Sequence, residues 1–208
     1  MWYLVKTPWW LKKLYPSCVW DLPANGKKIY LTFDDGPHPE VTPFVLDQLK
    51  KYNAKATFFC IGKNAAQHPG VYKRILEEGH AIGNHSFNHL NGWHSKDKDY
   101  FDDIIEARKY IDSKLFRPPY GKITRFQLKY LQAEGLKMKV IMWTVISGDF
   151  DDDVSPEKCY RNVADHIKPG RIIVFHDSDK AAEKLTYALP GVLEKLAKEG
   201  YDLQKISI

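Results

Sequence analysis

The feature that most constrains the fold of this chain is a regular alternation of short apolar runs with amphipathic helical segments. The alternation starts near Lys28 and continues to the end of the 208-residue sequence, with short connections between the elements. Such a pattern is typical of parallel α/β folds, because two parallel strands need a long crossover that is usually a helix. About six to eight βα units therefore predict a parallel sheet, open or closed into a barrel.

The expected strands are runs rich in apolar and β-branched residues. They lie at residues 28–33, 56–61, 81–83, 114–117, 139–145 and 171–175, with a closing strand at 203–208. Helical spacing of apolar residues predicts helices at 42–52, 69–78, 100–113, 124–134, 156–166 and 180–199. Thr42 and Ser155 are the expected N-caps of two of them. Residues 1–27 are expected to form an N-terminal arm packed on the domain of residues 28–208.

The charge distribution limits the expected binding partners, and the cysteine content indicates the redox state of the thiols. The net charge is +5, but the 31 basic residues are scattered and no run of five occurs. This distribution is typical of a solvated surface, and nucleic acid is not an expected partner. Cys18, Cys60 and Cys159 are widely spaced and show no disulfide pattern, so reduced or buried thiols are expected. No segment indicates an obligate protein partner.

The N-terminal segment is unusually rich in tryptophan. Four of the six Trp residues lie within the first twenty residues, at positions 2, 9, 10 and 20. The segment lacks the pattern of a signal peptide, and no stretch reaches the ~18 apolar residues of a membrane span. The localisation stays open between a cytoplasmic protein and one held at a membrane surface through this Trp- and Lys-bearing segment.

Unusual polar residues follow the expected strands, each at the point where a strand ends. They are Asp34, Asp35, His85, His89, residues 117–120, Asp149 and His176. In barrels and open α/β sheets, the carboxyl ends of parallel strands share one face, where binding sites are built. The sequence therefore predicts that these distant residues converge on one site.

A carboxylate pair and a histidine pair indicate metal chemistry. Asp34 and Asp35 repel each other, so a cation or an arginine is expected beside them, and one can bind a metal while the other stays free as a base. His85 and His89 are four residues apart, a spacing that presents two imidazoles to one ion. A set of one carboxylate and two histidines leaves coordination positions open for water and substrate.

Three further residues have the chemistry of a catalytic site. Arg117 is suited to pair with a carboxylate such as Asp34 and to keep it ionised. The proline-rich turn after Arg117 can aim the Tyr120 N–H at an oxyanion. His176 has the chemistry of a general acid, with Asp177 or Asp149 as the residue that orients it.

Each motif also has a plainer interpretation. Asp-Gly is common turn chemistry, the histidine pair suits a surface or a helix cap, and a proline-stiffened loop or a structural histidine needs no catalytic role. Moreover, a set of two histidines and one carboxylate also occurs in non-haem iron oxygenases, so the set alone does not fix the reaction.

Taken together, five segments resemble the motifs of the polysaccharide deacetylases of carbohydrate esterase family 4, the NodB homology group. They are TFDDGP at 32–37, H-S-x-x-H at 85–89, R-x-P-Y at 117–120, a weaker fourth motif around Asp149, and V-x-H at 174–176. The order matches that of the family, and the match covers the chain from about residue 28. The resemblance implies a TIM-like, deformed (β/α)7 barrel, with residues 28–208 as a single catalytic domain.

The same resemblance implies a metal-dependent hydrolase that removes acetyl groups from N-acetylated amino sugars of a glycan such as peptidoglycan, chitin-like oligomers or poly-N-acetylglucosamine. Asp35, His85 and His89 would bind a divalent ion, usually zinc, with other divalent transition metals as alternatives. The other implied roles are Asp34 as general base, Arg117 as its positioning partner, the Tyr120 N–H as oxyanion donor, His176 as general acid, Asp149 as the residue that tunes it, and Pro119, Phe150 and Val174 as the substrate pocket.

Three positions depart from the family pattern. Ile146 stands in place of the first Asp of the fourth motif, Phe150 in place of its Trp, and Val174 in place of the usual Leu. None of these changes removes a metal ligand or the acid–base pair, so activity is expected. A hydrolase of another C–N or O-acetyl substrate and a non-catalytic glycan-binding module are the alternative hypotheses.

Overall fold

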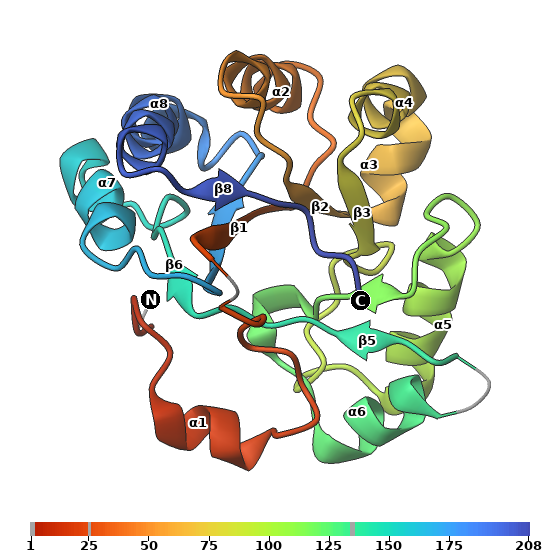
Figure 1. The fold of residues 1–208 in the computed structure, drawn as a ribbon. Coiled ribbons are helices and arrows are strands. Elements are labelled where there is room, and N and C mark those ends of the chain that lie inside the picture. The colour runs from red at the N-terminus through yellow and green to blue at the C-terminus, as the bar shows by residue number, and fades with distance from the viewer. Residues whose placement is uncertain (1–2, 25, 134–135) are drawn as a thin grey trace.

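The computed structural model describes residues 3–24, 26–133 and 136–208 (Figure 1). Strands and helices alternate along most of the chain. In chain order the elements are α1 (Trp9–Leu14), β1 (Lys28–Asp34), α2 (Val41–Lys51), β2 (Thr57–Cys60), α3 (Gly62–Gln67), α4 (Pro69–Glu77), β3 (Ala81–Asn84), α5 (Asp97–Ala107), β4 (Leu115–Phe116), the 3₁₀ turn η1 (Pro119–Gly121), α6 (Arg125–Gln132), β5 (Lys139–Val140), β6 (Val145–Ile146), α7 (Pro156–Ala164), β7 (Ile172–His176), α8 (Ala182–Lys198) and β8 (Asp202–Leu203).

The strands form one curled parallel sheet inside a ring of helices (Figure 1). The strand order is β5-β4-β3-β2-β1-β7-β6, and β8 adds to β1 away from this path. The structure thus confirms the predicted deformed barrel. Its consequence for function is that the carboxyl ends of neighbouring strands open on the same face, the position where such folds build their sites.

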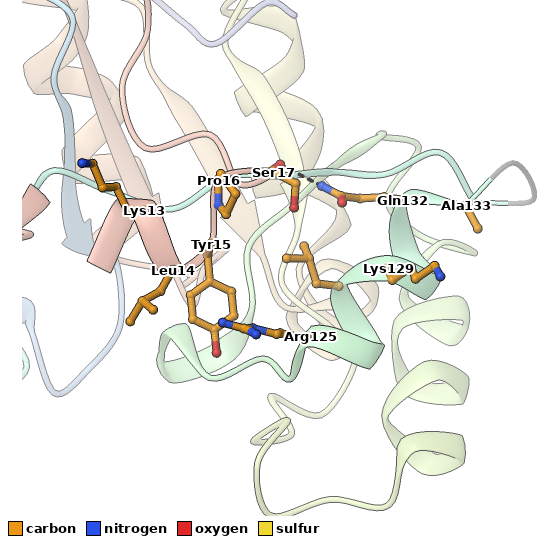
Figure 2. Close-up of a pocket in the computed structure, with 10 residues that line it drawn as sticks. Lys13, Leu14, Tyr15, Pro16, Ser17, Arg125, Lys129, Gln132 and Ala133 are labelled. Atoms are coloured by element: carbon orange, nitrogen blue, oxygen red, sulfur yellow. Dashed lines mark hydrogen bonds between the residues drawn. The ribbon is translucent and has the colours of Figure 1, made fainter. Parts of the chain in front are cut away.

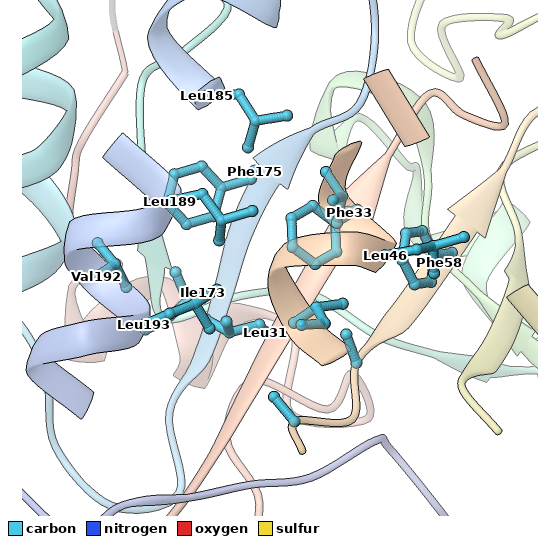
Figure 3. Packing of buried hydrophobic residues seen from close by; sticks show 14 of the residues in the cluster. Leu31, Phe33, Leu46, Phe58, Ile173, Phe175, Leu185, Leu189, Val192 and Leu193 are labelled. Carbon is cyan, nitrogen blue, oxygen red and sulfur yellow. The ribbon is translucent and has the colours of Figure 1, made fainter. Parts of the chain in front are cut away.

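Alternation along β1 separates the outer core from the barrel interior, because successive side chains of a strand point to opposite faces. Leu31 and Phe33 point outward and pack with residues of α2 and α8, including Leu46 and Leu189 (Figure 3). The same period places the side chain of Asp34 on the inner face of the barrel, at its carboxyl end. The apolar outer face therefore fixes the orientation of a catalytic candidate.

The N-terminal arm contacts both ends of the sheet. Lys6 forms an antiparallel bridge to Val145 in β6, and Val19 forms a parallel bridge to Ile141, which directly follows β5. The connection from β5 to β6 spans residues 141–144 and contains no helix. In Figure 1, α1 occupies the place in the ring of helices between α7 and α6, where a crossover helix is missing.

The arm also explains a strand that was predicted wrongly. The sequence predicts one strand over 139–145, but the structure has the two short strands β5 and β6. Val19 accepts a hydrogen bond from the Met142 N–H (2.8 Å) and donates one to the Val140 oxygen (2.9 Å). The backbone here pairs with a segment more than a hundred residues away, so no local pattern marks the interruption.

Several element ends also differ from expectation. Thr42 is not an N-cap, because α2 begins one residue earlier and the Thr42 hydroxyl is bonded to the Asp177 carboxylate instead. Ser155 caps α7 as predicted, through the Lys158 N–H. The helix expected over 100–113 is α5, which begins and ends earlier, and the closing strand is only β8. The predicted end of the 124–134 helix, and Trp2, lie outside the described residues.

Within the ranges described, no helix is long and apolar enough to cross a bilayer.

Candidate active site

The polar residues predicted to converge do meet at the carboxyl ends of the strands. Asp34 ends β1 and His176 ends β7, and these two residues are register partners in adjacent strands. His85 directly follows β3, and Arg117 directly follows β4, the strand paired with β3. Residues far apart in sequence are thereby brought to one face by strand pairing alone.

Asp35, His85 and His89 form a compact cluster of metal-ligand atoms. Their ligand atoms lie within 4.8 Å of one another. The Asp35 Oδ1 atom is 3.3 Å from Nε2 of His89 and 3.7 Å from Nε2 of His85. This oxygen is buried and has no hydrogen-bond partner in the part of the chain that the structure describes, which is costly unless a cation binds there. The three residues therefore fit a divalent metal ion, with the donor set of a catalytic site.

The histidines are held in the form that binds a metal. Nδ1 of His85 lies 2.7 Å from the Arg117 carbonyl oxygen, so Nδ1 carries the proton and Nε2 keeps its lone pair. Burial lowers the pKa of His85 well below its ordinary value, and the neighbouring His89 adds to this effect. Burial also lowers the pKa of His89, against the charge of Asp35. Neutral imidazoles are the ligand form.

The backbone around these ligands is held in sparsely populated conformations. The φ angles of Asp35, Ser86, His89 and Tyr120 are 81°, 62°, 59° and 58°. Non-glycine residues seldom adopt this left-handed region, and such residues cluster at functional sites. Here the conformation belongs to two of the three ligands and to the turn that carries Tyr120.

Polar residues that sequence reasoning missed anchor the histidine loop. The Asp103 carboxylate on α5 accepts hydrogen bonds from the N–H groups of Phe87 and Asn88, both at 3.0 Å. The Asn84 side chain accepts from the Ser86 N–H at 2.8 Å. One signal was available: Asp103 shares a helix face with the buried residues Tyr100 and Ala107. A charged residue on such a face needs internal partners.

Asn64 is a third missed support, because its side-chain amide donates to the Asp35 carbonyl oxygen at 2.7 Å. It holds the backbone of a ligand whose own conformation is strained.

Asp34 and Arg117 form a buried ion pair beside the metal cluster. The guanidinium donates to Oδ1 of Asp34 and to the Thr32 hydroxyl, both at 2.7 Å. Its other donors reach the carbonyl oxygens of Ile141 and Met142, so Arg117 is fixed on every side. Burial raises the pKa of Asp34, and the charge of Arg117 opposes that rise. Only Oδ1 is taken by Arg117, and Oδ2 is available as a base.

His176 and Asp149 form a second pair at the end of β7, the strand next to β1. Oδ1 of Asp149 accepts from Nδ1 of His176, and Oδ2 accepts from the backbone N–H of His176, both at 2.7 Å. Burial lowers the pKa of His176, but the charge of Asp149 and this hydrogen bond outweigh it and raise the pKa to about 9. At neutral pH His176 is therefore an imidazolium with its Nε2–H available as an acid.

Asp177 does not orient His176, which settles the choice left open by the sequence. Its carboxylate accepts a hydrogen bond from the Gly36 N–H at 3.1 Å and is bonded to the Thr42 hydroxyl. A Cβ on Gly36 would lie 2.1 Å from Oδ2 of Asp177. The glycine after the two aspartates is thus required by close packing against this carboxylate.

The remaining predicted residues are spread around the acid and base. The Tyr120 N–H donates to no acceptor among the described residues, and its ring contacts His89, with centroids 4.5 Å apart. Phe150 packs edge-on against His176 at 5.0 Å. Pro119 is buried in the turn, and Val174 is fully buried one layer below His176. A pocket role for these residues stays a prediction.

Comparison with known proteins identifies the family. A family model described as "Polysaccharide deacetylase" matches residues 21–139, more than half of the chain. The chain belongs to the polysaccharide deacetylase family. Its members include a peptidoglycan-N-acetylglucosamine deacetylase of Bacillus cereus, 36% identical over 203 residues that cover 94% of this chain and 95% of that protein. This chain is accordingly a deacetylase enzyme of the carbohydrate esterase family 4 type.

Two further similarities extend the comparison. A chitooligosaccharide deacetylase of Azorhizobium caulinodans is 34% identical over 202 residues, covering 88% of this chain and 94% of that protein. A crystal structure of a peptidoglycan N-acetylglucosamine deacetylase in complex with an N-hydroxybenzamide derivative superposes with a TM-score of 0.86 at 33% identity. That likeness covers 96% of this chain and 95% of the other, so the deacetylase fold extends over the N-terminal arm as well.

Proposed function

We propose that this deacetylase is a metal-dependent hydrolase that removes the N-acetyl group from amino sugars of a glycan, with N-acetylglucosamine residues of peptidoglycan as the first substrate class to test. The observation that carries the proposal is the buried Oδ1 of Asp35 beside His85 and His89, which has no hydrogen-bond partner among the described residues. Asp34, paired with Arg117, and His176, paired with Asp149, supply the base and the acid at the same end of the barrel. The named substrates of the relatives support the choice of glycan.

In this mechanism Asp35, His85 and His89 hold a divalent ion, with zinc as the first candidate because nitrogen and carboxylate donors suit it. A bound ion of this kind polarises a carbonyl oxygen and acidifies water. Oδ2 of Asp34 takes a proton from the water that attacks the acetyl carbonyl carbon. Arg117 orients Asp34 and opposes its protonation in a buried site.

The other residues act on the oxygen and nitrogen of the amide. The Tyr120 N–H donates a hydrogen bond to the carbonyl oxygen as negative charge develops there, an interaction worth about 3 kcal/mol when preorganised. Nε2 of His176 then gives its proton to the departing amine nitrogen as the C–N bond breaks. Water and the amide are converted to acetate and a free amino sugar, and no covalent enzyme intermediate is required.

Acetate release tests the proposal. The purified chain is incubated with N-acetylglucosamine oligomers, peptidoglycan fragments and acetylated xylan, before and after chelation, and then with a divalent ion restored. We expect acetate from the N-acetylated substrates, loss of turnover on chelation and recovery with the metal. Asp165→Asn, at an exposed position at the end of α7, serves as a control for Asp34→Asn. Turnover that survives full removal of metal, or acetate from the xylan alone, would contradict the proposal.

A further inference from the structure

Helix α1 packs Leu11 against the core but presents its other large apolar side chains to solvent. None of its residues is fully buried. Trp9, Trp10 and Leu14 are 69%, 50% and 47% exposed. Trp10 and Leu14 are one helical turn apart, so they share a face of the helix, and Trp9 shares the adjoining face with Lys13. A surface helix of a globular protein normally turns its apolar stripe toward the core, so this outward stripe calls for an external partner.

A groove of about 730 Å³ separates α1 and the segment after it from α6 (Figure 2). Among the described residues that line it, Lys13, Arg125 and Lys129 carry cationic side chains and none carries a carboxylate. Figure 2 shows Lys13 and Lys129 extending to opposite sides of the groove. The cations therefore do not converge on one small anion. They make a broad positive surface next to the exposed tryptophans.

This combination of side chains fits an anionic lipid surface. Tryptophan prefers the boundary between lipid headgroups and acyl chains, and basic residues near it are attracted to anionic headgroups. The Nζ of Lys13 lies 4.8 Å from the centre of a Trp9 ring, so charge and apolar surface are presented together. An anionic polysaccharide would account for the cations and for ring stacking, but an exposed Leu14 offers nothing to a sugar.

We propose that α1 and the cationic groove beside it form a peripheral docking face that binds the headgroup region of anionic bilayers. The face uses no residue of the metal cluster or of the acid and base pairs. Docking and deacetylation are therefore separable, and neither depends on the other in the experiment below.

Vesicle binding tests this directly. The full chain is sedimented with vesicles of phosphatidylglycerol and phosphatidylcholine, or of phosphatidylcholine alone, at low and at physiological salt. We expect binding to the anionic vesicles, weakened by salt because the charge attraction is screened. Trp9→Ala with Trp10→Ala should lower partitioning about tenfold, because the inserted apolar surface is lost. Lys13→Gln with Lys129→Gln should lower it about 25-fold, at about fivefold for each cation.

Matched controls separate docking from general surface effects. Tyr187→Ala on α8 removes an aromatic residue that is 54% exposed, and Lys73→Gln on α4 removes a lysine whose side chain is 74% exposed. Both should bind vesicles like the wild type, and all variants should keep turnover on a soluble oligosaccharide. The proposal is overturned if the wild type fails to bind anionic vesicles, if the controls lose as much binding as the α1 variants, or if an insoluble anionic glycan captures the chain and vesicles do not.

Discussion

Two carboxylate–cation pairs, Asp34–Arg117 and Asp149–His176, lie near the metal cluster, and they differ in which member is the functional group. The carboxylate is the functional group in the first pair and the cation in the second. In each pair a nitrogen lies 2.7 Å from a carboxylate oxygen. In one, the cation Arg117 is fully buried and the carboxylate of Asp34 keeps a free oxygen. In the other, Asp149 is fully buried and the cation, His176, is the partly exposed member. The member that reaches the site decides whether the pair supplies a base or an acid.

The two pairs differ in which partner keeps a hydrogen-bonding atom free for substrate. Arg117 uses its donors on Thr32, Asp34 and two carbonyl oxygens, and Asp149 uses both oxygens on His176. Four of the five N–H donors of Arg117 and both oxygens of Asp149 are thus engaged, while Oδ2 of Asp34 and Nε2 of His176 are bonded to none of the described residues. These contacts also fix the orientation of Asp34 and His176, because neither partner can move without losing several hydrogen bonds.

The largest effect on turnover should come from replacing the free carboxylate oxygen of Asp34 in the Asp34–Arg117 pair. Asp34→Asn keeps the shape and the contact with Arg117 but cannot take a proton, so kcat for acetate release should fall about 10³-fold. Stability should fall as well, because the buried Arg117 guanidinium loses its counter-ion, so thermal unfolding beside the wild type checks that the variant is folded at the assay temperature. If the Asp34→Asn variant turned over at the wild-type rate, Asp34 would not be the base and the comparison of the two pairs would fail.

The supporting partners should differ in what their loss does to stability. Arg117→Met leaves the buried Asp34 carboxylate without its counter-ion, which should cost about 3–5 kcal/mol of the free energy of unfolding. Asp149→Asn leaves a histidine that can become neutral, so its cost should be nearer to about 1–3 kcal/mol. Denaturant unfolding of both variants measures the contrast. Equal losses of unfolding free energy in the two variants would contradict the expected difference between a carboxylate that stays charged and a histidine that can become neutral.

The His176–Asp149 pair should also determine the pH dependence of turnover and of stability. Because the pKa of His176 is raised to about 9, turnover should fall as the pH rises through that value. The raised pKa of His176 also stabilises the folded state. This contribution to the free energy of unfolding is fully present below the unfolded-state pKa of 6.5 and is lost as the pH rises through about 9. In Asp149→Asn the descending limb should move to lower pH, since burial still lowers the pKa of His176 and the largest of the charges that raise it is gone, while the smaller effects of Asp35 and Asp34 remain. If the descending limb of the pH–rate profile does not move in this variant, the group that titrates there is not His176.

The smallest expected effect concerns the outer support of the acid pair. The ring of Tyr3, in the N-terminal arm, lies 5.1 Å from that of Phe150, which in turn packs on His176. Tyr3→Ala should lower kcat about three- to tenfold with KM nearly unchanged, because a loosened His176 is less often placed to donate. Leu4→Ala, an exposed neighbour in the same arm, is the control. Equal effects of the two variants would remove Tyr3 from the account.

The sequence predicts the central part of this site better than its supports. The parallel sheet and the convergence of Asp34, His85, Arg117 and His176 follow from strand periodicity and from the position of each residue after a strand. The choice of a deformed barrel over an open sheet comes from the family resemblance. The pairing of Asp34 with Arg117 also follows, because two adjacent carboxylates need a nearby cation.

The supports depend on contacts that no local pattern records. Asp103 and Asn64 bind backbone groups of loops that only the folded chain brings near them. The interruption between β5 and β6 depends on pairing with Val19, and the exposed stripe of α1 depends on where the arm lies on the barrel. The residue types alone left Asp149 and Asp177 open as the partner of His176; the family resemblance implied Asp149, and the hydrogen bonds of the two carboxylates agree with it.

The most direct test of the account is the metal content of three purified forms: wild type, Asp34→Asn and His89→Ala. If Asp35, His85 and His89 bind the ion and Asp34 does not, the wild type and the inactive Asp34→Asn variant should each hold one divalent ion per chain. His89→Ala should hold little or none. Loss of the ion from Asp34→Asn, or full retention by His89→Ala, would contradict this assignment.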